Sequence, residues 1–307
     1  MIKIRIPATT ANIGPGFDCF GMALNLYLFM EIEEINYGLI IQSKGEGAEQ
    51  FEKGESNLIW IAFNSVIKKY CIGKEVKGFR IKTFNQIPVT RGLGSSAAAI
   101  LAGILAASRF YNLKLTNSEI LEIALSLEGH LDNIVPALTG GFTLAYFTKK
   151  EKVKWMNIKI PDDLCIVVAI PDFSLSTEKM REVLPKKIDR SDAVFNLSRA
   201  ALLVNSLQNS DWALMAESME DKLHQPFRFS YIPGINEMFV QVKKTGHAGI
   251  ALSGSGPTVI SLTKKSYATM ISQIMEDAFL KAGIKSRVLI LKTDFEGFRL
   301  NSNDTIR

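Results

Sequence analysis

The sequence predicts a protein of mixed helices and strands (class α+β) with two domains. Its 307 residues fit one large domain or two modest ones. Segments with the two-residue period of a strand alternate with segments that have the 3.6-residue period of a helix. Because a charged run at 149–152 separates two such series, we predict a domain at 1–150 and another at 151–307, whose last strand could return to the first domain.

Local patterns predict the elements of the first domain. Charged and apolar residues alternate at 3–6, which indicates a strand that Pro7 ends, and 22–35 have the pattern of paired strands. Thr116 and Glu119 have the spacing of a capping box at the start of a helix. The other elements expected are helices at 57–70 and 95–111, the second apolar on most sides, an alternating strand at 79–83 and a further strand at 141–147.

The second domain is predicted in the same way. A continuous apolar run at 164–170 indicates a buried strand. Ile235, Met238 and Val242 recur at helical spacing, and Gly246 is placed to end that helix. The remaining elements are helices near 177–184, 192–207 and 266–282 and strands near 249–252, 257–262 and 286–292.

Composition excludes several classes of protein. Apolar residues make up 47% and charged residues 22% of the chain, which is typical of a globular protein rather than a disordered or fibrous one. The net charge of +5 is spread along the chain, so we expect no nucleic-acid binding. Three distant cysteines without metal-binding spacing indicate reduced thiols in the cytoplasm. The longest uncharged run, 92–108, is short and weakly apolar for a membrane span.

The strongest chemical signal lies at 88–99, where a strand leads through Gly92 and Gly94 into a helix of small residues. Glycines let a bound group approach the backbone, and the free N–H groups at a helix start attract an anion. Ser95 and Ser96 could donate to phosphate oxygens or bind Mg²⁺. The spacing is neither that of a Walker loop nor that of a dinucleotide-binding loop, and the plainer alternative is a core helix after a glycine turn.

Three other segments carry polar groups beside glycines or apolar strands. Segment 128–133 gathers two carboxylates, an imidazole and an amide, and one carboxylate could hold Mg²⁺. Segment 7–18 contains Asn12 and Asp18, which can bind an ammonium or a hydroxyl group, and 252–258 lies between apolar strands. Taken alone, the first could be a solvated loop and the other two simple turns.

Together the four segments resemble the motifs of the GHMP kinase superfamily, and most closely those of its branch that phosphorylates homoserine. The matched patterns are P-x-T-S-A-N-[LI]-G-P-G-F-D at 7–18, P-x-x-x-G-L-G-S-S-A-A at 88–98, E-G-H-x-D-N with A-P-A-L-x-G-G-F at 128–142, and S-G-x-G-P-T at 253–258. They occur in the family's order and spacing. The chain has Thr10, Cys19 and Leu131 where the family usually has Ser, Ser and Pro, and none of these removes a group that the chemistry needs.

This resemblance implies the fold and the activity. The first domain would resemble the second domain of ribosomal protein S5, and the second would be a ferredoxin-like domain. The activity would be transfer of a phosphoryl group from ATP, with Mg²⁺, to the hydroxyl of L-homoserine, a cytoplasmic step toward threonine. Family members are often dimers, so a homodimer is compatible with the resemblance.

The resemblance also implies roles for individual residues. ATP would bind at Asn57, Pro88, Val89, Thr90, Arg91, Gly92, Leu93, Gly94, Ser95, Ser96, Ala97 and Ala98, with Mg²⁺ held by Ser96 and Glu128. The homoserine pocket would be lined by Asn12, Asp18, His130, Asp132, Asn133, Arg181 and Arg228. The residues nearest the reaction would be Asn12, Asn133, Thr177 and Arg181.

The chemistry of homoserine agrees with these roles. Its carboxylate suits Arg181 and Arg228, because a guanidinium group binds a carboxylate at two points. Its ammonium group suits Asp18, and the amides of Asn12 and Asn133 could orient its hydroxyl.

Two groups of atoms could accept the proton of the homoserine hydroxyl: the phosphate oxygens or a basic side chain. Some kinases of the superfamily use an aspartate as base, whereas this chain has Asn133 at the corresponding place, and an amide cannot accept the proton. We therefore expect the proton to pass to a phosphate oxygen, with Asp132 or His130 as base as the alternative.

Two other functions compete with the leading one. A kinase of the superfamily acting on mevalonate or a sugar is disfavoured by Asn133 and by the arginine pair, Arg181 and Arg228. A non-catalytic ligand sensor on the same fold is disfavoured by the presence of Ser96 and Glu128, because such proteins typically lose phosphate or metal ligands.

Overall fold

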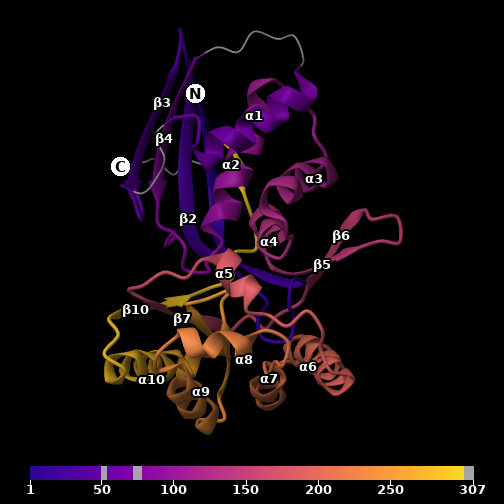
Figure 1. Cartoon of the computed structure of the whole chain (residues 1–307), viewed down its shortest axis with the longest axis vertical. Helices are drawn as coiled ribbons and strands as arrows, with labels where there is room; N and C mark the ends of the chain where they lie inside the picture. Colours follow the sequence, from indigo (N-terminus) through magenta and orange to yellow (C-terminus); the bar gives the residue numbers. More distant parts are fainter. Residues whose placement is uncertain (50–53, 72–77, 301–307) are drawn as a thin grey trace.

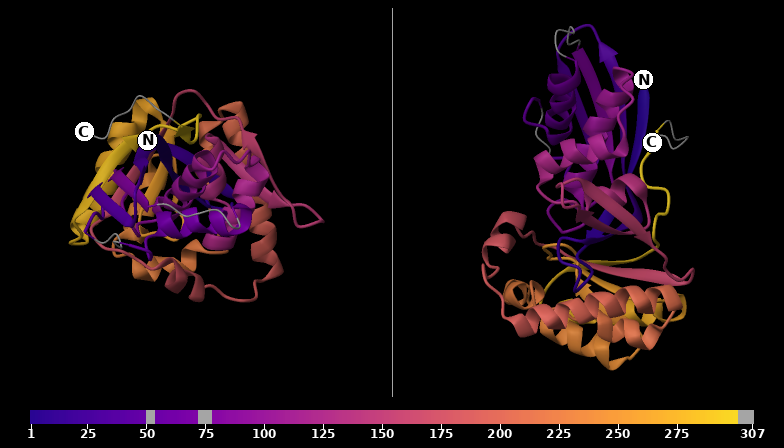
Figure 2. Two further views of the ribbon diagram at one scale, coloured as in Figure 1. Left: turned by 90° about the horizontal axis from the view of Figure 1, so that it is seen from above. Right: turned by 90° about the vertical axis from the view of Figure 1, so that its right-hand side faces the viewer.

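The computed structural model describes residues 1–49, 54–71 and 78–300, which form two lobes stacked along the long axis (Figure 1). One lobe is built on a seven-stranded sheet and the other on a four-stranded sheet. The side view in Figure 2 shows that the lobes meet at the ends of the first sheet's strands and at one face of the second sheet.

The first lobe contains most of the chain before residue 160 and the last described strand. Its elements are β1 (Ile2–Ala11), β2 (Phe20–Ile35), β3 (Leu39–Gly45), α1 (Leu58–Tyr70), β4 (Gly78–Asn85), α2 (Ser95–Phe110), α3 (Asn117–Glu128), α4 (Ile134–Thr139), β5 (Phe142–Phe147), β6 (Val153–Ile158) and β11 (Arg299–Leu300). The sheet has the order β11-β1-β2-β4-β3, and β5 pairs with both β2 and β6. Helices α1 to α4 cover one face of this sheet (Figure 1).

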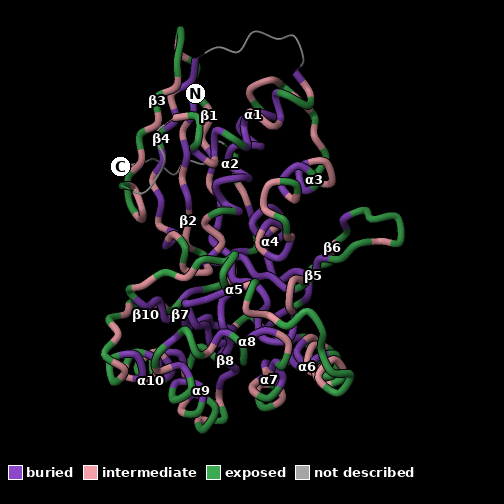
Figure 3. Tube along the Cα trace, in the orientation of Figure 1, coloured by how far each residue is buried: buried purple, intermediate pink, exposed green. Residues whose placement is uncertain are grey.

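Helix α2 lies at the centre of this lobe and is buried along residues 97–108 (Figure 3). Its alanines keep it thin enough to lie between β1 and the neighbouring helices α1, α3 and α4. At Gly103 the approach of α1 is so close that a Cβ atom would overlap the carbonyl oxygen of Ile59. Packing on all sides therefore fixes the direction in which the N-terminus of α2 points.

The second lobe is built from the elements that follow β6. These are β7 (Leu164–Pro171), α5 (Thr177–Glu182), α6 (Arg190–Asn209), α7 (Trp212–Ser218), α8 (Gln225–Arg228), α9 (Ile235–Lys244), β8 (Ala248–Leu252), β9 (Val259–Lys264), α10 (Ala268–Lys281) and β10 (Ser286–Leu291), with 3₁₀ turns at Phe229–Tyr231 and Lys265–Tyr267. The antiparallel strand order β10-β7-β9-β8, with helices after the first and third strands, is the ferredoxin-like arrangement.

Strand β7 joins the two lobes because its side chains belong to both hydrophobic cores. Cys165, Val167 and Ala169 pack with α9 and α10 on one face of the second sheet. Ile166 and Val168 point to the other face and belong to the core shared with the first lobe. A strand buried on both faces reads as a continuous apolar run, which is the pattern that predicted it.

Two local predictions have different outcomes. The capping box is confirmed, because the Thr116 hydroxyl accepts from the Glu119 N–H and the Glu119 carboxylate accepts from the Thr116 N–H. The end of the first strand at Pro7 is wrong, because β1 continues to Ala11. The pairing of β1 with β2 shifts register between Pro7 and Ala8, and this irregularity accommodates the missing proline N–H.

The change from one sheet to the other falls between Ile158 and Leu164, since β6 still pairs with β5. At the far end of the chain, β11 pairs with β1 and so extends the first sheet. Residues 301–307 lie outside the described part of the chain. Among the described helices, none has both the length and the apolar character needed to cross a membrane.

Candidate active site

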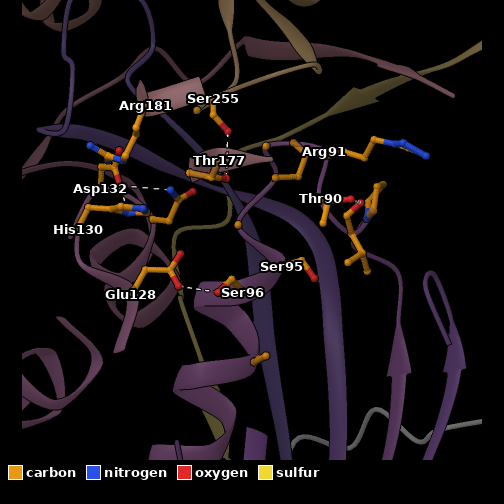
Figure 4. A pocket seen from close by; sticks show the side chains of 18 of the residues that line it. Thr90, Arg91, Ser95, Ser96, Glu128, His130, Asp132, Thr177, Arg181 and Ser255 are labelled. Carbon is orange, nitrogen blue, oxygen red and sulfur yellow. Dashed lines mark hydrogen bonds and ion pairs between the residues drawn. The ribbon is translucent and has the colours of Figure 1, made fainter. Parts of the chain in front are cut away.

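A cleft of about 320 Å³ opens where the two lobes meet, and the four glycine-bearing segments converge on it (Figure 4). Its lining includes every residue predicted for the site except two. These are Asn12, Asp18, Asn57, Pro88, Val89, Thr90, Arg91, Gly92, Leu93, Gly94, Ser95, Ser96, Glu128, His130, Asp132, Asn133, Thr177, Arg181 and Arg228. Ala97 and Ala98 are fully buried inside α2 and do not reach the cleft.

The loop before α2 exposes backbone N–H groups to the cleft. Gly94 precedes the helix in the left-handed conformation, with φ of 70°, and no side chain caps the helix. Gly92 has φ of +79° and lies so close to Ser253 that a Cβ atom would overlap the Ser253 carbonyl oxygen. The Ser253 hydroxyl donates to the Gly92 carbonyl at 2.5 Å, so the fourth segment holds the loop in place. An anion at this helix N-terminus is favoured by the free N–H groups and the helix dipole.

Ser96 and Glu128 bring a hydroxyl and a carboxylate together beside this loop. The Ser96 hydroxyl donates to Oε2 of Glu128 at 2.6 Å (Figure 4). Within the described residues no three His, Cys, Asp or Glu side chains gather in a metal-binding group. A site with one carboxylate and one hydroxyl fits Mg²⁺, which keeps several waters and takes its other ligands from substrate phosphates.

Asp18 and Arg181 form a two-point ion pair across the cleft. Nη2 of Arg181 donates to Oδ1 of Asp18 at 2.7 Å, and Nη1 donates to Oδ2 at 3.0 Å. This bond raises the pKa of Arg181. Both side chains are more than one-third exposed, so a ligand can reach the pair. The predicted carboxylate ligand Arg181 and the predicted ammonium ligand Asp18 thus bind each other in the structure.

Asn12 fixes the position of Asp18 in this ion pair. Its Oδ1 accepts from the backbone N–H of Asp18 at 2.9 Å, and its Nδ2 donates to the carbonyl of Gly254 at 2.9 Å. Only 3% of Asn12 is exposed. Its amide, predicted to orient the acceptor hydroxyl, therefore connects two backbone segments and positions Asp18.

Arg228 brings a buried positive charge to the cleft. It is 1% exposed and donates to the carbonyls of Met180 at 3.0 Å and Gly254 at 3.2 Å. Burial, reinforced by the charge of Arg181, lowers the pKa of Arg228 to about 10. No carboxylate of the described residues lies within ion-pair distance of it. A buried cation without a direct counter-ion favours a bound anion.

His224 orients Arg228 toward the cleft. Its Nε2 lies 2.8 Å from the carbonyl of Gly14, which can only accept, so Nε2 carries the proton. Nδ1 then accepts from Nη1 of Arg228 at 3.1 Å. Burial lowers the pKa of His224 against the opposing charge of Asp221, and Arg228 adds to the lowering. Phe17 stacks on the His224 ring, with centroids 5.2 Å apart.

The remaining polar groups form a chain at the other side of the cleft. Nδ1 of His130 lies 3.1 Å from Oδ1 of Asp132 as an ion-pair contact. Burial opposes the charge on His130, but Asp132 and, more weakly, Glu128 outweigh it and raise its pKa. Nδ2 of Asn133 donates to the same Asp132 oxygen at 3.2 Å, and the Thr9 hydroxyl donates to Oδ1 of Asn133 at 2.8 Å.

Several residues of the site were not predicted from the sequence. Phe17, Gly254 and Ser255 line the cleft, and the Thr177 and Ser255 hydroxyls lie 3.2 Å apart. All three lie inside the segments already singled out, so their position in the motifs was a usable signal. His224 precedes Arg228 by four residues, a spacing that places both on one side of a helical turn.

Comparisons with known proteins agree with this geometry. The family descriptions of the N-terminal and C-terminal domains of GHMP kinases match residues 57–141 and 203–281. A homoserine kinase of Desulfitobacterium hafniense is 42% identical over 97% of this chain and 99% of its own length. The crystal structure of a homoserine kinase from Cytophaga hutchinsonii has a TM-score of 0.85 at 29% identity and covers 97% of this chain and 96% of its own. The L. major mevalonate kinase, with a TM-score of 0.71 at 16% identity over 96% of both chains, shares the fold.

The contrast between His130 and His224 gives a first prediction. The chain has 3 histidines, so their ring protons can be followed separately by NMR, with His130 assigned through its loss in His130→Gln. We expect His130 to titrate above 6.5 and His224 to stay neutral at that pH. Asp132→Asn should lower the pKa of His130, because it removes the charge that stabilises the protonated ring. A His130 midpoint below 6.5, or one that does not respond to Asp132→Asn, would contradict the ion pair.

Proposed function

Because this chain belongs to the GHMP kinase family, we propose that it transfers the γ-phosphoryl group of ATP to the hydroxyl of L-homoserine and forms O-phospho-L-homoserine. One observation carries the choice of acceptor. A cleft beside a phosphate-binding loop holds the Asp18–Arg181 ion pair and the buried cation Arg228, which together complement the charges of an α-amino acid.

The nucleotide would bind through the backbone of the loop before α2. The N–H groups at the start of the helix face the cleft, and their partial positive charge favours phosphate oxygens. Asn57, which caps α1 by accepting from the Ile59 N–H, lines the cleft and would contact the adenine. Ser96 and Glu128 would hold Mg²⁺, which neutralises charge on the phosphates when bound.

The acceptor would bind by replacing the Asp18–Arg181 pair with its own charges. The ammonium group of homoserine would face Asp18, and its carboxylate would face Arg181 and Arg228. Two-point guanidinium–carboxylate bonds fix the orientation of the amino acid as well as its affinity. Mevalonate has no ammonium group and a sugar has no charge, so either would leave Asp18 or the arginines without a partner, which is costly in a partly buried site.

The transfer itself would need little from the protein beyond position and charge. A bond forms between the homoserine hydroxyl oxygen and the γ-phosphorus, the bond to the β-phosphate oxygen breaks, and ADP leaves. The hydroxyl proton passes to an oxygen of the transferred phosphoryl group. His130 is already paired with Asp132 at 3.1 Å, which raises the pKa of His130, and Asp132 is 3% exposed and accepts from Asn133.

We also propose that the reaction takes place in the cytoplasm as part of threonine biosynthesis. The three cysteines are free thiols, which agrees with a reducing compartment. Homoserine kinase activity in the named relatives supports the same biosynthetic step for this chain.

A substrate panel tests the proposed function. ADP release in the presence of Mg²⁺ is measured with L-homoserine, mevalonate and galactose as acceptors. We expect kcat/KM for homoserine to exceed the others by at least about 10²-fold, because the site holds charged groups that only the amino acid satisfies. Faster turnover of mevalonate or galactose would reassign the acceptor. Binding of homoserine without ADP release would indicate a ligand sensor.

The carboxylate role of Arg181 gives a second test. Arg181→Leu removes one charged ligand and should raise KM for homoserine by about 10-fold to 100-fold, the usual effect of losing a charge-assisted hydrogen bond. KM for ATP should stay within about twofold, since Arg181 pairs with Asp18 on the proposed acceptor side of the cleft. Arg190→Leu, at an exposed position that starts α6, serves as the matched control. An effect confined to ATP would refute the assignment.

The proposed role of Glu128 as a metal ligand gives a third test of the function. Glu128→Gln keeps the shape of the side chain but removes its charge, and should lower kcat at least about 10²-fold because the metal stabilises charge in the transition state by several kcal/mol. Glu122→Gln, exposed on the same helix, should keep full activity. Circular dichroism would confirm that both variants fold. Near-normal turnover of Glu128→Gln at saturating Mg²⁺ would show that another group holds the metal.

A further inference from the structure

We propose that Thr9 is a positioning residue that fixes the side-chain amide of Asn133 with an N–H bond directed to the acceptor. The inference rests on the proposed function, since it concerns the hydroxyl that receives the phosphoryl group. Thr9 is fully buried on β1 and does not line the cleft. It would therefore act on the reaction only through Asn133.

The Thr9 hydroxyl lies where three segments of the site meet. It donates to Oδ1 of Asn133 at 2.8 Å, and the Thr9 backbone N–H donates to the carbonyl of Leu93 at 3.1 Å. A Cβ atom at Gly94 would overlap the Thr9 hydroxyl and would come within 3.1 Å of Oδ1 of Asn133. The hydroxyl is thus packed against Gly94 of the loop and bonded to Asn133.

The surroundings of Asn133 determine which way its amide faces. Nδ2 donates to Oδ1 of Asp132 at 3.2 Å. The reversed amide would place its oxygen against this carboxylate, and two acceptors at that distance repel each other, the more so because Asp132 is 3% exposed. The amide oxygen must therefore face Thr9, and the hydroxyl of Thr9 supplies the one donor that the structure shows for it.

This orientation determines whether Asn133 presents a hydrogen-bond donor or an acceptor to the cleft. Its amide nitrogen has two hydrogens, of which one is bonded to Asp132. The other is available on the cleft side, where Asn133 is part of the lining. Asn133 is thus a donor to the acceptor hydroxyl oxygen and not an acceptor of its hydrogen. The hydrogen of that hydroxyl is left to point toward the phosphate, which is the direction that proton transfer to a phosphate oxygen requires.

Loss of the Thr9 hydroxyl should release this orientation. Thr9→Val has the same shape but no donor, so the buried oxygen of Asn133 would be unpaired and the amide would turn to find another partner. We expect kcat for homoserine to fall about tenfold, which corresponds to the net contribution of one hydrogen bond, while KM for ATP stays within about twofold. Thr9→Ser keeps the hydroxyl and should restore kcat to within about threefold of the wild-type value.

A substrate analogue separates this role from general damage to the pocket. L-2-aminobutyrate differs from homoserine only in lacking the hydroxyl, so Asn133 has nothing to orient. Its inhibition constant should be the same in the wild-type protein and in Thr9→Val. Thr263→Val is the matched control, because Thr263 is also fully buried and donates to one backbone carbonyl, that of His247 at 2.9 Å, but lies outside the cleft. It should leave kcat unchanged.

Each outcome has a defined meaning. Unchanged kcat in Thr9→Val, a parallel rise in the aminobutyrate inhibition constant, or a Thr9→Ser variant as slow as Thr9→Val would each overturn the proposal. Should Thr9→Val not fold, Thr9→Ala removes the same hydroxyl without a β-branch and carries the same expectation. The wild-type rate with homoserine is measured in the same assay, so failure of the proposed function would show there and not in the comparison between variants.

Discussion

The site depends on how α2 begins. Gly94 adopts a left-handed conformation and has no side chain to cap the helix, so the first N–H groups remain available to an anion. Residues 97–108 are buried on all sides, which prevents the helix from tilting and fixes the direction of those groups. The alanines that make this burial possible are therefore part of the phosphate site, although Ala97 and Ala98 contact nothing in the cleft. In the function that we propose, Ser96 and Glu128 would add the oxygen ligands that a phosphate-bound Mg²⁺ needs.

The side of the cleft that would bind the acceptor carries charged side chains that are partly or fully buried. Arg228 is held by the carbonyls of Met180 and Gly254 and by the neutral ring of His224, so its charge is hydrogen-bonded but not neutralised. Asp18 and Arg181 neutralise each other at the more exposed side. A bound zwitterion can replace this pair with two new ones, in which its ammonium group faces Asp18 and its carboxylate faces Arg181. The same carboxylate also supplies an anion to Arg228. A ligand with only one of the two charges cannot do both, which is the physical basis of discrimination.

The sequence predicts the elements and the motifs better than the contacts between them. The apolar pattern places α2 within a residue, the capping box places the start of α3, and the length of the apolar run identifies β7, because these are properties of neighbouring residues. Pro7 misleads, since only the pairing of β1 with β2 shows that the strand continues through an irregularity. The Asp18–Arg181 pair joins residues far apart in the chain, and the roles of Asn12 and Thr9 depend on which atom faces which partner. No local pattern carries that information.

Buried hydrogen bonds between the two lobes fix the position of the residues that each lobe contributes to the cleft. The end of β1 meets the second lobe through three contacts. The Thr10 and Ser253 hydroxyls lie 2.9 Å apart, the Gly254 N–H donates to the Ala11 carbonyl, and the Asn12 amide donates to the Gly254 carbonyl. These bonds are buried and uncharged, so salt and pH affect them little. Arg228 belongs to the second lobe and Asn133 to the first. These bonds between the lobes therefore set the separation between Arg228 and Asn133, and the acceptor that we propose must have the length that spans it.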